Sequence, residues 1–125
     1  MQSLNREDFD QLLADTSHYI LVDFWAPWCA PCRTVTPILE SLEDQYQDLV
    51  IFTKVNVDEV PSLMDAFRLR SVPSVLLLKP NEGGNGAQVI DALIGAQPGH
   101  TYCSWLDRHL YPKPSIFSKI RAWFK

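Results

Sequence analysis

Residues 20–32 read ILVDFWAPWCAPC, an apolar run that passes directly into two cysteines three positions apart. Residues 19–26 are apolar except for Asp23, which is typical of a strand buried on both faces. From Pro31 onward the apolar residues recur at helical spacing, so the strand should give way to a helix at the cysteines. This stretch therefore predicts two thiols, Cys29 and Cys32, held one turn apart between a buried strand and a helix.

The position of the thiols predicts their chemistry. A helix N-terminus carries unpaired N–H groups and partial positive charge, and both favour a thiolate over a thiol. Cys29 is nearer that end, so we expect it to ionise more readily, while Cys32 should be more buried. Cys29 would attack a substrate disulfide, and Cys32 would then attack Cys29 and release the reduced substrate.

Two other interpretations fit a C-x-x-C pair. It could be half of a zinc site, with Cys103 and His100 or His109 as further ligands, or a pair of inert core cysteines. The sequence holds no second C-x-x-C, and the Trp and Pro neighbours are unusual for zinc. We favour the redox interpretation, with no metal and no bound cofactor, because the chain has no G-x-G-x-x-G fingerprint for a nucleotide. Cys103 is then a packing thiol.

The rest of the chain alternates between strand and helix patterns. Asn5 precedes two acids and an apolar stripe, which predicts a capped helix. Strands joined through helices should pair in parallel, and strands joined by a short turn should form an antiparallel hairpin. The further predicted elements are a helix from Pro31, a strand over 50–57, a helix over 61–69, strands over 75–78 and 87–94 around a turn at 81–86, and a helix over 99–110.

These motifs resemble the thioredoxin family across roughly residues 5–110. The resemblance rests on DFWAPWCAPCR over 23–33, Pro37, Lys54, SVPS over 71–74 and Gly95-Ala96, in matching order and spacing. It implies an α/β thioredoxin fold, a central mixed sheet flanked by helices. It also implies that Cys29 is the nucleophile, that Cys32 is the resolving thiol, and that a cis Pro73 faces both.

Two charged residues are candidates for supporting catalysis. An isolated buried carboxylate tends to stay protonated, and Asp23 is the only ionisable residue in the run 20–26. The resemblance implies that Asp23 is the general base for Cys32, acting through water, and that Lys54 lies near Asp23 and tunes it. The alternatives are an aspartate satisfied by backbone at a strand end and a solvent-facing lysine.

A docking surface is also implied around the thiols. Trp28 should cover the active-site surface, whereas Trp25 should pack or hydrogen-bond beneath it. The resemblance implies an apolar substrate-binding surface, in which substrate backbone could pair with Val72 as a strand. Its residues are Val57, Val72, Ile94, Gly95 and Ala96, and the alternative is that they are ordinary core and turn residues.

Two positions depart from the family pattern. Ala30 stands where the family usually has glycine between the cysteines, so we expect a small change in redox poise. Ser71 replaces the usual glycine before the Val-Pro pair and should narrow the docking groove.

The charge distribution divides the chain. Four of the 11 basic residues and none of the 15 acidic residues fall in 111–125, so this segment carries about +4 and residues 1–110 about −8. An acidic domain argues against nucleic acid as a partner. The segment forms a basic amphipathic C-terminal extension, which suits docking on its own domain, an anionic membrane surface or a partner protein. Its apolar face would carry Ile116, Phe117, Ile120, Trp123 and Phe124.

The sequence thus predicts a thioredoxin-like domain over 1–110 and the extension over 111–125. The polar N-terminus and the lack of a long apolar run favour the cytoplasm, where thiols stay reduced. We expect a monomeric protein-disulfide reductase that takes electrons from a thioredoxin-reductase-type donor. The alternatives are a client-binding co-chaperone using the same groove and an oxidase or isomerase of higher reduction potential.

Overall fold

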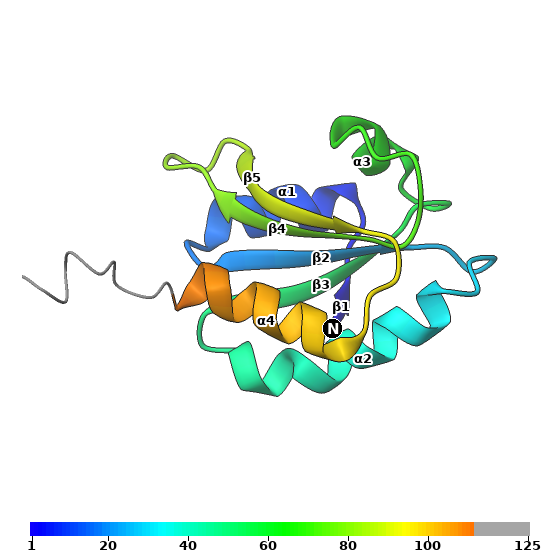
Figure 1. Cartoon of the computed structure of the whole chain (residues 1–125). Coiled ribbons are helices and arrows are strands. Elements are labelled where there is room, and N and C mark those ends of the chain that lie inside the picture. Colours follow the sequence, from blue (N-terminus) through cyan, green and yellow to red (C-terminus); the bar gives the residue numbers. More distant parts are fainter. Residues whose placement is uncertain (112–125) are drawn as a thin grey trace, which may run out of the picture.

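A computed structural model describes residues 1–111, in which five strands form one mixed sheet covered by helices on both faces (Figure 1). The order across the sheet is β1-β3-β2-β4-β5. The strands are β1 (Gln2–Ser3), β2 (Tyr19–Trp25), β3 (Val50–Asn56), β4 (Ser74–Pro80) and β5 (Ala87–Ile94), and the helices are α1 (Arg6–Asp15), α2 (Cys32–Tyr46), α3 (Pro61–Ala66) and α4 (Gly99–Leu110). The predicted mixed sheet flanked by helices is confirmed.

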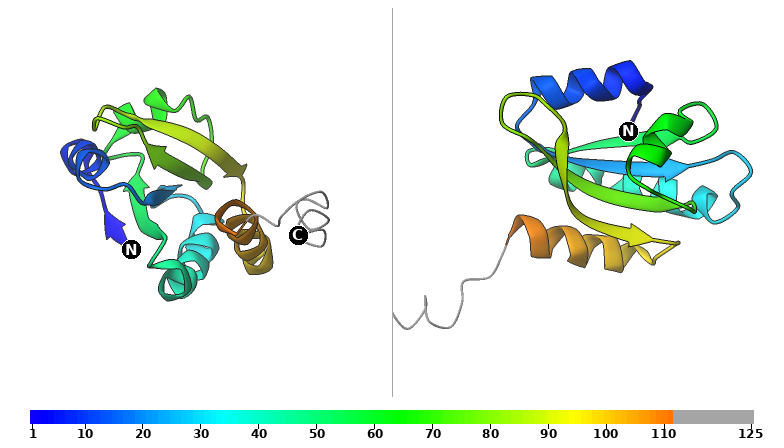
Figure 2. Two further views of the ribbon diagram at one scale, coloured as in Figure 1. Left: turned by 90° about the vertical axis from the view of Figure 1, so that its left-hand side faces the viewer. Right: turned by 90° about the horizontal axis from the view of Figure 1, so that it is seen from above.

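Strand β2 lies in the middle of the sheet and is buried on both faces, as its apolar run predicts. Side chains alternate along a strand, so Ile20 and Phe24 pack in the core beside α1 and α3, whereas Leu21 packs in the core beside α2 and α4. Figure 2 shows the sheet between these helical layers. By the same alternation Asp23 faces α2, which carries the second cysteine.

The unit β2-α2-β3 has the expected parallel pairing. Helix α2 crosses the sheet and returns the chain to the start of β3, whose residues pair with β2 from Tyr19 with Val50 to Trp25 with Asn56. In this register Asp23 lies directly beside Lys54. Both strands end at the same edge of the sheet, where the cysteine loop follows β2 (Figure 1).

The prediction of parallel pairing is wrong for β4. This strand also follows a helix, but it runs antiparallel to β2. Helix α3 has six residues and is about 9 Å long, whereas β3 spans about 23 Å. Such a short helix does not carry the chain back along the length of the sheet. Strand β4 therefore starts at the side of the sheet where β3 has its C-terminal end. Helix α3 also stops before the predicted Leu69, because Arg68 adopts a positive φ of 55°.

The two strands at the edges of the sheet, β5 and β1, differ in how easily they are predicted from the sequence. Strands β4 and β5 form the predicted antiparallel hairpin, with an irregularity between Leu77 and Leu78. Strand β1 was not predicted, because two residues are too few to show a period. It pairs in parallel with β3 through Thr53 and Lys54 and forms the opposite edge of the sheet.

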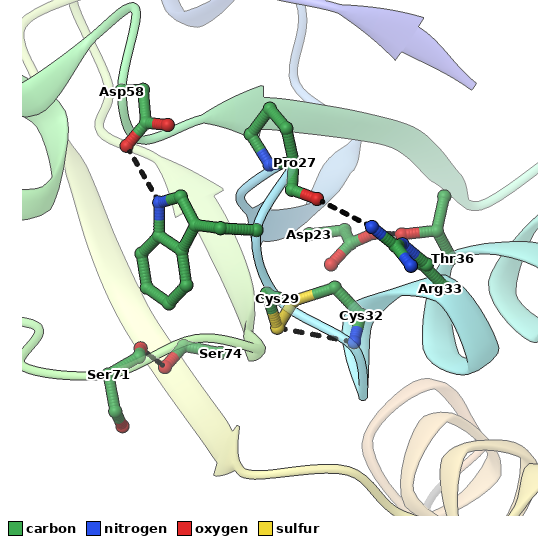
Figure 3. The surroundings of a disulfide bond; sticks show 10 residues. Asp23, Pro27, Cys29, Cys32, Arg33, Thr36, Asp58, Ser71 and Ser74 are labelled. Atoms are coloured by element: carbon green, nitrogen blue, oxygen red, sulfur yellow. Dashed lines mark hydrogen bonds between the residues drawn. A yellow bond between two sulfur atoms is a disulfide. The ribbon is translucent and has the colours of Figure 1, made fainter.

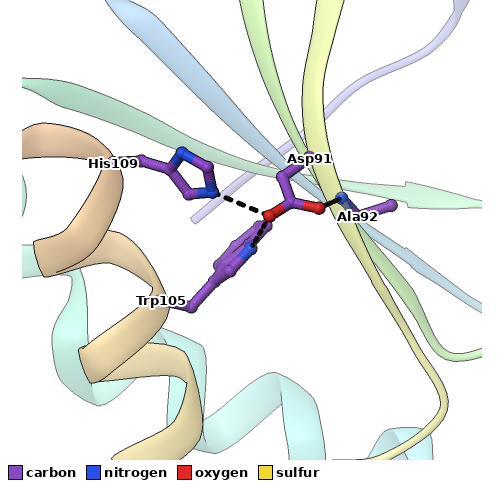
Figure 4. A network of polar contacts seen from close by, with 4 residues as sticks. All are labelled: Asp91, Ala92, Trp105 and His109. Carbon is purple, nitrogen blue, oxygen red and sulfur yellow. Dashed lines mark hydrogen bonds and ion pairs between the residues drawn. The ribbon is translucent and has the colours of Figure 1, made fainter.

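A polar cluster fastens α4 to β5 (Figure 4). Asp91 accepts a hydrogen bond of 3.0 Å from Trp105 Nε1, and His109 Nε2 lies 2.7 Å from the same carboxylate oxygen. Burial raises the pKa of Asp91, but hydrogen bonds from His109, Ala92 and Trp105 outweigh it and hold that pKa below its usual range. The cluster fixes the two elements that flank the Gly95-Ala96 segment. It also packs His109 against the Trp105 ring.

Cys103 has the packing position expected for it. Its sulfur lies 3.2 Å from the Tyr46 hydroxyl, which donates a hydrogen bond of 2.6 Å to Asp107.

Within residues 1–111 no three His, Cys, Asp or Glu side chains gather to hold a metal ion, and no helix is long and apolar enough to cross a membrane. The predicted amphipathic face of the extension lies outside the described residues.

Candidate active site

The cysteines lie at the junction of β2 and α2, and they form a disulfide (Figure 3). Their Cα atoms are 5.4 Å apart. The Cys29 N–H donates to Ala26 O at 3.1 Å, which folds the loop back on the end of β2. The Cys32 N–H then donates to Cys29 Sγ at 3.2 Å. The sulfur of the first cysteine thus sits at the N-terminus of α2, as predicted.

The structure at the start of α2 explains why the Cys32 N–H donates to the Cys29 sulfur. Pro31 occupies the N-cap position of the helix, and it provides no side-chain cap. The N–H groups of Arg33 and Thr34 donate to carbonyl groups of the preceding turn, whereas that of Cys32 donates to Cys29. Donation from a helix N-terminus stabilises negative charge on the acceptor. A thiolate at Cys29 would therefore be stabilised in place.

Burial alone does not distinguish the two cysteines. Cys29 is 3% exposed and Cys32 is 2% exposed, so the predicted difference in burial is only slight. The distinction lies in the contact, because the Cys29 sulfur receives the N–H of Cys32. The assignment of the more readily ionised thiol therefore rests on the helix N-terminus rather than on exposure.

Asp23 is fully buried behind the cysteines. The pKa of this carboxyl group is raised to about 6, mainly because the group is buried. A hydrogen bond from Thr36 and the charge of Lys54 lower the pKa by smaller amounts, and the charge of Glu40 raises it slightly. Oδ2 accepts the Thr36 hydroxyl at 2.5 Å, and buried Oδ1 has no hydrogen-bond partner among the described residues. The carboxyl group therefore changes its charge state close to neutral pH.

Lys54 lies beside Asp23 on the neighbouring strand and is half-buried. Its ammonium group stands 5.9 Å from the centre of the Trp25 ring. The Lys54 side chain is thus partly exposed to solvent and partly packed against Trp25. Trp25 packs beneath the site as expected, but its buried Nε1 has no hydrogen-bond partner within residues 1–111.

An open pocket of 280 Å³ lies beside the second cysteine. Its volume is sufficient for several water molecules. Cys32 and Lys54 contribute to its wall, and solvent can approach the buried side of the dithiol through it. The full lining is Trp25, Ala26, Pro27, Cys32, Arg33, Thr36, Pro37 and Lys54.

The segment before β4 lies in the surroundings of the disulfide (Figure 3). The Val72–Pro73 peptide bond is cis, as the resemblance implies. The Pro73 carbonyl accepts the Gly95 N–H at 2.9 Å, which joins the start of β4 to the end of β5. Gly95 reaches this position with a φ of +85°, which favours glycine. Ser71 is exposed, and its carbonyl accepts the Ser74 hydroxyl at 2.7 Å.

The predicted docking residues differ in accessibility. Trp28 is 68% exposed, Ile94 is 52% exposed, and Ala96 is also exposed. Val72 is half-buried, and Val57 is 7% exposed and packs in the core. Trp28, Ile94 and Ala96 are therefore accessible at the surface, whereas the burial of Val57 favours the alternative of a core residue.

Sequence reasoning missed two residues of the site. Asp58 accepts a hydrogen bond of 3.1 Å from Trp28 Nε1 and so fixes the exposed indole (Figure 3). No local pattern indicates this contact, because it joins loops that follow different strands. Thr36 could have been found, since it follows Cys32 by four positions and must share its helix face.

The fold and the paired cysteines define a thiol-disulfide oxidoreductase, and comparisons with known proteins agree. A family model described as Thioredoxin matches residues 1–107. Thioredoxin 1 of Synechococcus elongatus is 41% identical over 102 residues, 82% of this chain and 90% of that protein. The thioredoxin of Chlorobaculum thiosulfatiphilum is 36% identical over 104 residues, covering 83% and 91%. The M-type chloroplastic thioredoxin of Chlamydomonas reinhardtii is 32% identical over 108 residues, covering 86% and 73%.

The chain belongs to the thioredoxin family. Members of this family act on disulfide-containing proteins and are themselves reduced by a reductase. The cytoplasmic location expected from the sequence stays a prediction, because similar proteins include chloroplastic ones.

Proposed function

We propose that the protein reduces disulfides in other proteins, with Cys29 as nucleophile. The contact between the Cys32 N–H and Cys29 Sγ carries this assignment. The Cys29 thiolate attacks a substrate disulfide, so that a Cys29–substrate bond forms and one substrate sulfur leaves as a thiolate. Cys32 then attacks Cys29, the 29–32 bond forms, and the second substrate sulfur leaves. Two electrons pass from the protein to the substrate.

Asp23 acts as the base of the second step. Attack by Cys32 requires the loss of its thiol proton, and a carboxyl group with a pKa of about 6 can take that proton near neutral pH. Oδ1 has no hydrogen-bond partner among residues 1–111, and this together with the pocket beside Cys32 supports transfer through water. Lys54 lowers the pKa of Asp23 and so favours the form that accepts the proton.

Substrate docking follows from the exposed residues around the disulfide. An extended substrate segment would lie against Trp28 and Ile94, and its backbone would pair beside cis-Pro73 at Val72. Gly95 and Ala96 form the turn beside this segment. We propose that electrons come from a separate thioredoxin-reductase-type donor, that no cofactor is bound, and that the protein works as a monomer in the cytoplasm.

Coupled insulin reduction tests this function. The protein, a thioredoxin reductase and NADPH are mixed with insulin, and NADPH oxidation and insulin precipitation are followed. Turnover that depends on the protein supports a reductase. A client-binding co-chaperone would instead hold unfolded proteins equally well after serine replaces both Cys29 and Cys32, without insulin turnover.

The extension gives a separate prediction. A contact of residues 115–125 with an anionic membrane surface predicts that the full chain floats with phosphatidylserine-containing vesicles at low salt. A chain that ends at Tyr111 should stay in the unbound fraction. High salt should weaken flotation of the full chain, because charge attraction contributes to it. Equal partitioning of the two chains would contradict the proposed membrane contact. The remaining interpretations of the extension would then be docking on the acidic domain and docking on a partner protein.

A further inference from the structure

Thr36 makes the only side-chain hydrogen bond to Asp23 within the described part of the chain. Its Oγ1 donates to Asp23 Oδ2 at 2.5 Å. Thr36 follows Cys32 by one helical turn, and both residues line the same pocket. One hydroxyl group thus bridges the face of α2 that carries the resolving cysteine to the buried carboxyl group on β2 (Figure 3).

The other ionisable groups around Asp23 act at longer range. Lys54 on β3 and Glu40 on α2 influence it through charge, and Tyr102 on α4 is influenced by it. None of these makes a hydrogen bond to the carboxyl group among the described residues. A threonine hydroxyl group that donates to a carboxylate stabilises the ionised form and fixes the direction of the carboxylate plane.

We propose that Thr36 is a positioning residue, which holds Asp23 as an oriented carboxylate with Oδ2 occupied and Oδ1 free to receive the proton of Cys32. This inference rests on the proposed role of Asp23 as the base. In the step concerned, the proton of the Cys32 thiol passes to Asp23. The Cys32 sulfur then bonds to Cys29, and the bond between Cys29 and the departing sulfur breaks.

The expected effect of removing the hydroxyl group has a definite sign. Burial raises the pKa of Asp23, and the Thr36 hydrogen bond lowers it. A hydrogen bond to a charged group is strong enough to change a pKa by about one unit. Without it Asp23 should ionise about one pH unit higher, and at pH 6 the ionised fraction should fall about fivefold.

Reduction of Ellman's reagent, 5,5′-dithiobis(2-nitrobenzoate), separates the two steps. The first thionitrobenzoate is released when Cys29 attacks, and the second is released when Cys32 resolves the mixed disulfide. Stopped-flow rates are measured from pH 5 to 8 for the wild type, Thr36→Val and Thr36→Ser. Thr36→Val should move the acid limb of the second phase up by about one pH unit and leave the first phase unchanged. Thr36→Ser should keep the wild-type profile, and Thr36→Ala replaces the valine variant if that variant does not fold.

Asp23→Asn separates this inference from the proposed function. Thr36→Val should cause no further shift in the Asp23→Asn background. An unchanged second phase in Asp23→Asn would overturn the role of Asp23 as base and, with it, the role of Thr36. A changed profile in Asp23→Asn together with a wild-type profile in Thr36→Val would overturn the role of Thr36 alone.

Discussion

Serine in place of Cys29 should reduce insulin turnover by on the order of 10³-fold or more, to the level without the protein. A serine hydroxyl group is not ionised at neutral pH, so the N–H at the start of α2 would have no anion to stabilise. Serine in place of Cys32 should have a different effect. Cys29 would still attack, but the intramolecular displacement would be lost, and with it the high effective concentration of the second thiol. This variant should accumulate a mixed disulfide with its substrate.

Non-reducing electrophoresis and mass spectrometry distinguish the two variants. Cys32→Ser should give a substrate adduct at Cys29 that thiols dissolve, and Cys29→Ser should give none. Cys103→Ser is the matched control, because this half-buried thiol packs beside Tyr46 and should leave turnover unchanged. Capture of substrate by Cys29→Ser rather than by Cys32→Ser would reverse the assignment of the two cysteines.

Asparagine in place of Asp23 should stabilise the folded oxidised protein by about 3 kcal/mol at pH 7 and above. The pKa of Asp23 rises from its usual 3.8 to about 6 on folding, so the folded state binds more protons between these values. The wild type should therefore lose stability as the pH rises from about 4 to about 7. Asparagine carries no charge to bury, and its side-chain oxygen still accepts the Thr36 hydrogen bond.

Urea unfolding of the oxidised wild type and Asp23→Asn between pH 4 and 8 measures this effect. The two free energies of unfolding should be similar near pH 4 and diverge until about pH 7. A constant difference across this range would show that Asp23 does not titrate on folding as the structure indicates. Stabilisation together with slower resolution by Cys32 would show that the buried carboxylate is kept for activity at a cost in stability.

The sequence predicts the centre of the fold well, because strong local signals coincide there. The run 19–26 is too apolar for anything but a buried strand, and the helical spacing after Pro31 defines α2. Asn5 caps α1 through a 2.7 Å hydrogen bond from the Asp8 N–H. The two cysteines fall at the junction of these patterns, so the position of the redox pair follows from local order in the chain.

Features that depend on distances in space could not be predicted in this way. The direction of β4 depends on how far six residues of α3 reach, and β1 is too short to have a pattern. The contact of Asp58 with Trp28 joins two loops that meet only in the folded sheet. The resemblance supplied the cis Val72–Pro73 bond, which no local pattern indicates.

The hydrogen bond of Thr36 to Asp23 is only partly predictable from the sequence. The spacing of Thr36 from Cys32 is visible in the sequence, but the value of Thr36 as a hydrogen-bond donor depends on which face of β2 carries Asp23. The alternation along β2 gives that answer once the helices are assigned to faces of the sheet. Two features of the sequence can therefore be used together to predict such a hydrogen bond. They are an aspartate in the buried strand before a redox cysteine pair and a polar residue one helical turn after the second cysteine.

The rate at which Cys29 reacts with iodoacetamide at pH 7 tests the central claim most directly. The reduced protein is labelled for short times, and the modified residue is identified by mass spectrometry beside free cysteine as the reference. Cys29 should be labelled faster than free cysteine and before Cys32, because the N-terminus of α2 stabilises its thiolate. Labelling of Cys29 no faster than free cysteine, or of Cys32 first, would contradict the account.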